Sequence, residues 1–315
     1  MQRASKKVFG TIGTRGSPLA LYQARHVQQL LCAAHDLTEE DVPLKIFTTS
    51  GDKLKGELKD FGGKGLFTKE LEEALLSGEI DMAVHSMKDV PTTQQPGLEL
   101  GAILEREDPR DAFISHQVSH LAHLPKGAVI GTASIRRRAQ LAHQRPDLRF
   151  TLLRGNVGTR LAKLEAGECD ATFLACAGLK RLGQADVITE SIPTSTMLPA
   201  PAQGAIGIEI RADDIELHDA FKPLNHIPTH IAISCERAFL KALDGSCRTP
   251  IAALATYDDQ YLEFRGEVFS EDGRQYFSCQ DTQAVTNAQQ AATLGERLGQ
   301  DLLTEIGGQP LWAKG

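Results

Sequence analysis

Three segments of the chain place arginine beside a residue that can cap a helix. They are Thr14-Arg15-Gly16-Ser17, the stretch from Gly131 to Arg137, and the stretch from Arg154 to Arg160. Each follows a β-rich run and precedes a helical pattern, so free backbone N–H groups and the positive end of a helix dipole lie beside a guanidinium. Guanidinium groups bind carboxylates or phosphates through paired hydrogen bonds. One such segment is usually an ordinary capped helix, but three together indicate a ligand with several negative charges.

Arginine is concentrated in one part of an otherwise acidic protein. The chain has 34 Lys and Arg against 41 Asp and Glu, a formal net charge of -7. Between residues 131 and 160, however, there are no lysines or glutamates, one aspartate and seven arginines: Arg136, Arg137, Arg138, Arg145, Arg149, Arg154 and Arg160. The overall charge argues against a generally basic surface for nucleic acid or an anionic membrane. Because the chain has neither a GxxxxGK[ST] loop nor a GxGxxG after a strand, the usual nucleotide motifs are missing, although phosphates remain possible.

A polar cluster follows an apolar strand between Ala83 and Pro91, in the sequence AVHSMKDVP. Ligands bind at the C-terminal ends of strands in open α/β sheets, so Lys88 and Asp89 could point into a binding site. A carboxylate there could stabilise a cationic intermediate or move a proton. A solvated Lys-Asp turn explains the segment equally well.

Cys247 lies in a turn bounded by glycine and proline, between Asp244 and Pro250. With Arg248 adjacent, its thiol could be exposed and ionised, either as a nucleophile or as an attachment point. An ordinary loop cysteine is the alternative. The six cysteines contain no CxxC pair, and such sparse usage predicts reduced thiols.

Two further loops and two groups of histidines give weaker indications of function. The glycine-rich loop from Gly62 to Phe67 could be a mobile lid carrying Lys64, or a plain loop; the second loop runs from Pro201 to Ala205. The histidines at 116, 120 and 123, and at 226 and 230, have spacings that resemble those of metal ligands. Because no carboxylate or cysteine completes a recognised pattern, we expect no metal site.

The elements expected around these motifs give an α/β fold. Strands are predicted at about 8–14, 44–49, 80–85, 98–104, 129–132, 150–153, 172–175 and 205–210, with helices beginning at Ser17-Pro18, Leu66, Ser134 and Asn156. Alternation of this kind predicts mostly parallel sheets. After about residue 222 the pattern changes to helix 228–243, β-rich 251–269, a strand to 279 and helix 287–306, which is typical of a smaller α+β domain.

We therefore expect three domains: residues 1–104 with 199–221, residues 105–198, and residues 222–315. The strand at 205–210 would rejoin the first sheet, so the first two domains become lobes around a cleft, where small molecules are often bound. The N-terminus shows no apolar leader and no segment approaches a membrane span. We expect a cytoplasmic protein with no nucleic-acid or membrane partner.

Long motifs in register resemble those of the porphobilinogen deaminase (hydroxymethylbilane synthase) family. They are TRGSPLAL, GGKGLFTKELE, AVHSMKDVPT, GTASIRRRAQL, LRGNVGTRL, AGLKRLG, PAPAQGAIGIE and the run from Glu236 to Pro250, in order over about residues 8 to 252. The resemblance implies a transferase of haem biosynthesis that joins four porphobilinogen molecules head to tail with release of four ammonia. It also implies two lobes like those of periplasmic binding proteins plus an α+β domain, and we expect a monomer.

The same resemblance implies a site residue by residue. It gives Asp89 and Lys88 catalytic roles, with Asp89 stabilising positive charge on the pyrrole nitrogens after ammonia leaves. A dipyrromethane cofactor would be held by a thioether to Cys247 and by Ser86, Lys88, Asp89, Thr132, Ser134, Arg136, Arg137, Arg154, Gly155 and Asn156. Substrate would be bound by Arg15, Ser17, Gln23, Lys64, Phe67, Arg154, Arg160, Arg181 and Gln203. The arginines would then neutralise the acetate and propionate groups of the growing chain.

Three positions depart from the family pattern. Lys59 stands three residues ahead of the glycine loop instead of the usual two, Ala202 replaces a glycine before Gln203, and Ser246 replaces a glycine before the cysteine. The competing interpretation is a non-catalytic two-lobe protein that binds a polycarboxylate. The lack of a secretion signal and the exposed position expected for Cys247 count against it.

Overall fold

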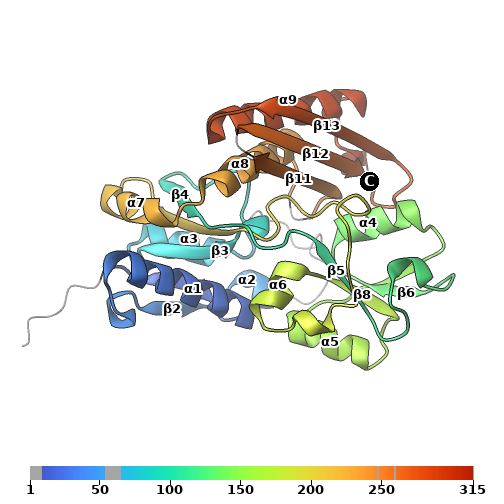
Figure 1. Ribbon diagram of the computed structural model, residues 1–315, viewed down its shortest axis with the longest axis horizontal. Coiled ribbons are helices and arrows are strands. Elements are labelled where there is room, and N and C mark those ends of the chain that lie inside the picture. The colour runs from blue at the N-terminus through green and yellow to red at the C-terminus, as the bar shows by residue number, and fades with distance from the viewer. Residues whose placement is uncertain (1–8, 54–64, 247, 259, 315) are drawn as a thin grey trace, which may run out of the picture. The chain divides into compact units, whose positions relative to one another are not determined.

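The computed structural model describes residues 9–53, 65–246, 248–258 and 260–314 (Figure 1). The chain folds into two compact units. The first consists of Met1–Lys55, Gly63–Glu105 and Ala205–His230, and the second of Gly56–Gly62, Arg106–Gly204 and Ile231–Gly315. The finer division into three domains stays a prediction.

The first unit contains a five-stranded mixed sheet. Its order is β2 (Leu44–Phe47), β1 (Ile12–Arg15), β3 (Met82–Ser86), β10 (Ile206–Arg211), β4 (Leu98–Ile103). β1 is parallel to β2 and β3, whereas β10 is antiparallel to both β3 and β4. The prediction that residues 205–210 rejoin this sheet is confirmed, but the prediction of a mostly parallel sheet is wrong. Between β3 and β4 the chain inserts a strand that runs against both.

Helices cover both faces of this sheet. α1 (Pro18–His35) buries Ala24, Val27 and Leu31 against one face, while α3 (Lys69–Leu76) buries Leu71 and Leu75 against the other. Side chains alternate along β3, with Met82 and Val84 on the α1 side and Ala83 on the α3 side, as the two-residue period of a strand requires. This unit also contains α2 (Ser50–Lys53) and α7 (Ile215–Phe221).

The second unit repeats this pattern in its larger sheet. The order is β7 (Arg149–Thr151), β6 (Val129–Gly131), β8 (Ala171–Ala175), β5 (Asp111–Ser115), β9 (Glu190–Ser191). β6 is parallel to β7 and β8, and β5 is antiparallel to β8 and β9. Three helices belong to this part: α4 (Ile135–Gln144), α5 (Val157–Glu165) and α6 (Cys176–Arg181). β5 and β9 were not predicted.

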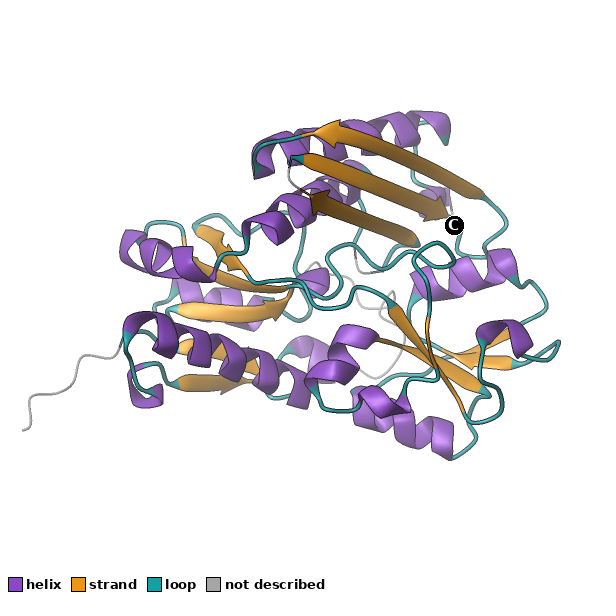
Figure 2. Ribbon diagram, viewed as in Figure 1, coloured by secondary structure: helices purple, strands orange, loops and turns teal. Residues whose placement is uncertain are grey.

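The end of the chain forms a three-stranded antiparallel sheet with two long helices. The strands are β11 (Ile251–Asp258), β12 (Tyr261–Phe269) and β13 (Tyr276–Ala284), and the helices are α8 (Ile227–Ala242) and α9 (Ala288–Glu305). Figure 2 shows α9 lying along the strands, and Phe239, Phe264 and Leu298 are buried in one core between them. Gly295 allows α9 to approach α8, because a Cβ at this position would collide with the carbonyl oxygen of Cys235. The expected α+β character is confirmed.

Candidate functional site

The three helix starts that sequence analysis singled out are capped as predicted. Ser17 Oγ accepts a hydrogen bond from the backbone N–H of Ala20 at 3.3 Å, at the start of α1. Ser134 Oγ accepts from Arg137 N–H at 3.4 Å at the start of α4. Asn156 Oδ1 accepts from Thr159 N–H at 2.9 Å at the start of α5. Each cap satisfies only one of the amides that a helix start leaves open.

Arg15 and Phe67 are brought together in the first unit. The guanidinium carbon of Arg15 lies 4.4 Å from the centre of the Phe67 ring. Arg15 ends β1, and Phe67 lies just before α3. At this distance the ring attracts the guanidinium through a cation–π interaction, which restricts where the Arg15 side chain can lie. The structure therefore pairs two residues that the family resemblance assigned to substrate separately.

Hydrogen bonds anchor the polar cluster at the end of β3. Ser86 Oγ and the buried Gln23 amide exchange hydrogen bonds of 2.8 and 3.1 Å. The backbone N–H of Met87 donates to Ala205 O at 3.0 Å. One residue earlier, His85 Nε2 lies 3.0 Å from Glu209 Oε2 on β10. Sequence analysis missed this buried pair, whose partners lie 124 residues apart.

These contacts fix the single turn of 3-10 helix, Met87–Asp89, that carries both predicted catalytic residues. Lys88 and Asp89 are half-buried there. Within the parts of the chain that the structure describes, the carboxylate of Asp89 has no hydrogen-bond or ion-pair partner. A carboxylate on a fixed turn without such a partner is available to an external cation or proton.

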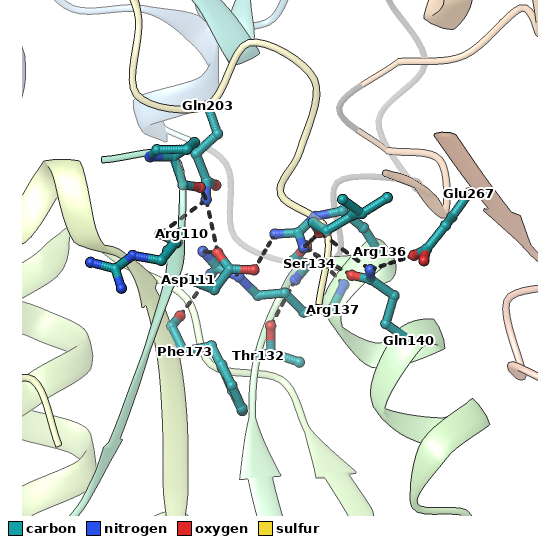
Figure 3. A network of polar contacts seen from close by, with 12 residues as sticks. Arg110, Asp111, Thr132, Ser134, Arg136, Arg137, Gln140, Phe173, Gln203 and Glu267 are labelled. Carbon is teal, nitrogen blue, oxygen red and sulfur yellow. Dashed lines mark hydrogen bonds and ion pairs between the residues drawn. The ribbon is translucent and has the colours of Figure 1, made fainter. Parts of the chain in front are cut away.

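A buried charge network lies behind the start of α4 in the second unit (Figure 3). Asp111, fully buried at the start of β5, accepts hydrogen bonds from Arg137 Nε at 3.2 Å and Arg137 Nη2 at 2.7 Å. Its other oxygen lies 2.8 Å from Arg136 Nη2. Gln203 Nε2 donates to Asp111 Oδ1 at 3.0 Å. Arg137 Nη1 also donates to Phe173 O at 2.7 Å, which ties the network to β8.

Burial alone would raise the pKa of the Asp111 carboxyl, but Arg136 and Arg137 together lower that pKa well below its ordinary value. The carboxylate is therefore ionised at neutral pH. Two guanidiniums then share one full negative charge in the interior, and the three groups together carry a net positive charge. Such a group attracts an anionic ligand more strongly than a surface arginine does, because solvent screens it less.

Several arginines of the cluster at 131–160 have protein partners that sequence analysis did not identify. Arg136 and Arg137 pair with Asp111, and Arg145 pairs with Asp147 at 2.7 Å. Asp111 was missed because it lies outside the arginine-rich segment, as the first residue of β5. A carboxylate that opens an apolar run, as in DAFIS, is the signal that could have found it.

Two guanidinium N–H groups near the α4 and β7 ends are buried without a partner. Among the residues that the structure describes, Arg136 Nε and Arg154 Nη1 make no hydrogen bond. Arg154 follows β7 and precedes Gly155, whose φ of 125° turns the chain into the Asn156 cap. Buried donors are rarely left unsatisfied. Cationic donors of this kind fit a ligand that brings carboxylates, and so the residues present fit a dipyrromethane with acidic side chains.

The loop before β10 is anchored to this network. Gln203 is buried, and its amide also donates to Pro109 O at 2.7 Å. Arg181 Nη2 donates to Gly204 O at 2.7 Å. Ala202 adopts φ 62°, a left-handed conformation in which glycine is less strained. This conformation gives a physical reason for the glycine that the family often has at the position of Ala202.

Replacing Gly204 with alanine should destabilise the protein by about 2 to 4 kcal/mol. Gly204 has φ 94°, and a Cβ there would collide with the carbonyl oxygen of Glu107. Gly167→Ala is the matched control, since Gly167 has φ 75° but no atom within 4 Å of the added Cβ. Urea unfolding of the two variants separates the collision from the backbone strain that both share. Equal urea midpoints for the two variants would contradict the close approach of Gly204 to the carbonyl oxygen of Glu107.

The remaining predicted residues are placed as follows. Thr132 Oγ1 accepts from Ser134 N–H at 3.1 Å, and Arg160 Nε donates to Gly155 O at 2.8 Å. Lys64 and Cys247, as well as Lys59, lie outside the described residues. No group of three or more metal-ligating side chains occurs among the residues described. Within the same residues, no helix is long and apolar enough to cross a membrane.

Comparison with known proteins assigns the chain to a family. Residues 11–219 match the family model "Porphobilinogen deaminase, dipyromethane cofactor binding domain", and residues 230–304 match "Porphobilinogen deaminase, C-terminal domain". The porphobilinogen deaminases of Nitrobacter hamburgensis and Nitrobacter winogradskyi are each 48% identical over 307 residues, covering 96% of this chain and 97% of theirs.

A likeness to a solved structure covers about two-thirds of this chain. The VFT2 domain of BvgS from Bordetella pertussis is 18% identical with a TM-score of 0.43, covering 68% of this chain and 84% of that domain. The motifs, the capped arginine-bearing helix starts and the two matched family models agree over nearly the whole chain. This chain belongs to the porphobilinogen deaminase family.

Proposed function

We propose that the protein is a hydroxymethylbilane synthase, which joins four porphobilinogen molecules head to tail and releases four ammonia molecules to give linear hydroxymethylbilane. Membership of the family over nearly the full chain carries this conclusion. Two buried guanidinium donors, on Arg136 and Arg154, have no hydrogen-bond partner among the described residues, and they support a ligand rich in carboxylates. Each porphobilinogen brings an acetate and a propionate, so the demand for positive charge grows as the product lengthens.

The cofactor would be a dipyrromethane joined through a thioether to Cys247. When bound, it supplies the pyrrole carbon to which the first substrate is joined. Its carboxylates would be held by Arg136 and Arg154, with Thr132, Ser134, Arg137, Gly155 and Asn156 forming the surrounding helix starts. Ser86, Lys88 and Asp89 would complete the set of cofactor contacts. Backbone N–H groups at the two helix starts add partial positive charge without further side chains.

Asp89 would act on the substrate at the point where charge develops. Loss of ammonia leaves positive charge spread over the pyrrole ring and its nitrogen, and a fixed carboxylate lowers the energy of that state. The same carboxylate can accept the proton that leaves when the new bond has formed. Lys88 would bind a substrate carboxylate beside it. Arg15, Ser17, Gln23, Lys64, Phe67, Arg160, Arg181 and Gln203 would bind the remaining substrate groups.

Intact mass of the denatured protein tests the proposal directly. Chain purified from cells that make porphobilinogen should carry the additional mass of one dipyrromethane, and Cys247→Ala should lose it completely. Cys32→Ala, which removes a different free thiol, is the control and should keep the added mass. An unmodified wild-type chain would favour a two-lobe protein that binds a polycarboxylate without turning it over.

We further propose that the protein works as a monomer in the cytoplasm, with porphobilinogen as its partner and no nucleic acid or membrane. The described cysteines Cys32, Cys169, Cys176, Cys235 and Cys279 are free thiols, in keeping with a reducing compartment. The net charge of -7 disfavours binding to anionic polymers.

A further inference from the structure

A glutamate of the C-terminal sheet reaches the buried arginine pair through one intermediate side chain. Gln140 on α4 accepts a hydrogen bond from Arg136 Nη1 on its Oε1 at 2.9 Å. The amide nitrogen of Gln140 donates to Glu267 Oε2 on β12 at 3.0 Å (Figure 3). None of the sequence motifs included Glu267, and no ligand-binding role was assigned to it.

The amide of Gln140 has one orientation in this arrangement. Its nitrogen donates both to Glu267 and to Leu198 O at 3.2 Å, so its oxygen must face Arg136. Arg136 Nη1 in turn also donates to Leu198 O at 2.7 Å. Arg136 is held by Gln140 and Leu198 on one side and by Asp111 on the other. Its Nε, which makes no hydrogen bond to any residue that the structure describes, therefore keeps a defined direction. Glu267 thereby contributes to the orientation of that donor.

Glu267 also affects the charge of the network. Arg136 and Arg137 are 4% and 5% exposed and share the single carboxylate of Asp111. An ionised Glu267 would balance the second guanidinium, whereas a neutral Glu267 leaves one positive charge in excess. Burial raises the pKa of Glu267, against the lowering effect of Arg265 and Arg136. The other groups around its carboxylate are Gln140 and the Tyr276 hydroxyl, whose oxygen lies 3.5 Å from Oε1.

We propose that Glu267 is a positioning residue of the cofactor site: through Gln140 it orients Arg136, and through its charge it moderates how strongly Arg136 binds a carboxylate of the dipyrromethane. This inference rests on the proposed function. It assigns opposite effects to the hydrogen bond and to the charge of one side chain. A neutral side chain that still accepts the Gln140 hydrogen bond should strengthen binding, and a neutral side chain that cannot accept it should weaken binding.

Two substitutions separate these effects during cofactor loading. Full-length chain made in cells that lack porphobilinogen is incubated with increasing porphobilinogen, and the loaded fraction is read by intact mass. Glu267→Gln should lower the half-saturating porphobilinogen concentration about threefold to tenfold, because one negative charge beside a buried guanidinium is removed. Glu267→Leu should raise that concentration by a similar factor, because Gln140 loses the partner that fixes its amide. Glu263→Gln, an exposed glutamate two residues from Arg265 on the same strand, should leave it unchanged.

The pH dependence of loading gives an independent readout. As pH falls through the raised pKa of Glu267, its protonation should lower the half-saturating concentration in the wild type, and this step should be absent from Glu267→Gln. A purely structural contact would not produce that step. The proposal fails if Glu267→Gln loads no better than the wild type, even where Glu267→Leu does not fold. Failure of the wild type to load at all would overturn the proposed function itself.

Discussion

Asp111→Ala is expected to destabilise the protein by about 3 to 5 kcal/mol, because removal of one partner leaves buried charges uncompensated. Asp111 accepts hydrogen bonds from Arg137 and Gln203 and pairs with Arg136, and it has no exposed surface. Without it, two buried guanidiniums face each other with no carboxylate between them. Urea unfolding at neutral pH measures the loss.

The same variant should change the acid stability of the protein in a defined direction. The pKa of Asp111 is lowered in the folded state, so its contribution is complete above the unfolded pKa of about 4 and decreases as pH falls towards the lower folded pKa. Asp111→Ala should therefore lack this part of the decrease in stability below pH 4. The free energy of unfolding of Asp111→Ala should be lower than that of the wild type at neutral pH and should decrease less on acidification.

Asp147→Ala provides the matched control for Asp111. Arg145 and Asp147 form a pair with two hydrogen bonds of 2.7 Å, as close as the buried one, but both side chains are partly exposed. Ion pairs at the surface contribute little because water solvates the partners when the pair is broken. The unfolding midpoint of Asp147→Ala should stay close to that of the wild type. Similar losses for the two variants would contradict the importance assigned to burial.

Asp89→Asn is expected to reduce porphobilinogen turnover by about 10²- to 10³-fold with the fold intact, since it removes a charge placed where positive charge develops. The side chain has no hydrogen-bond or ion-pair partner among the described residues, so the change breaks no such contact. The turn itself is held by the Met87 backbone and by Ser86. Release of ammonia per chain, with intact mass to report cofactor loading, measures the effect.

Asp213→Asn controls for the loss of one negative charge in the same unit. Asp213 is exposed on the turn between β10 and α7, away from the motifs that define the site. The turnover rate and the unfolding temperature of Asp213→Asn should match those of the wild type. Ammonia release by Asp89→Asn at near-normal rates would remove the role proposed for that carboxylate. A large drop in its unfolding temperature would show instead that Asp89 is needed for the fold.

Sequence reasoning succeeded where the determining interactions are local. Ser17, Ser134 and Asn156 cap the helices that their positions predicted, because a cap bonds an amide only three residues along the chain. The helical and strand periods likewise located α1, α8 and α9 within a few residues of their ends.

Interactions between distant segments were not accessible in this way. Arg137 pairs with Asp111, 26 residues earlier and on another element, and Glu267 bonds Gln140 over a separation of 127 residues. Neither pairing has a periodic or local signal. The direction of β10 was missed for a related reason: the pattern of a strand predicts its faces, but its direction relative to neighbours depends on where the chain enters the sheet.

The insertion of β10 between β3 and β4 determines when the first sheet can form during synthesis. In the structure as described, β4 pairs with β10 and with no other strand. Residues 98–103 therefore leave the ribosome about a hundred residues before the strand that joins them to the sheet, an interval of about 5 to 20 s at ordinary rates of translation. During that time β3 and β4 both expose an unpaired edge, which is a template for aggregation. The first sheet is completed late, and nascent chains that stop before residue 206 are the forms most in need of a chaperone.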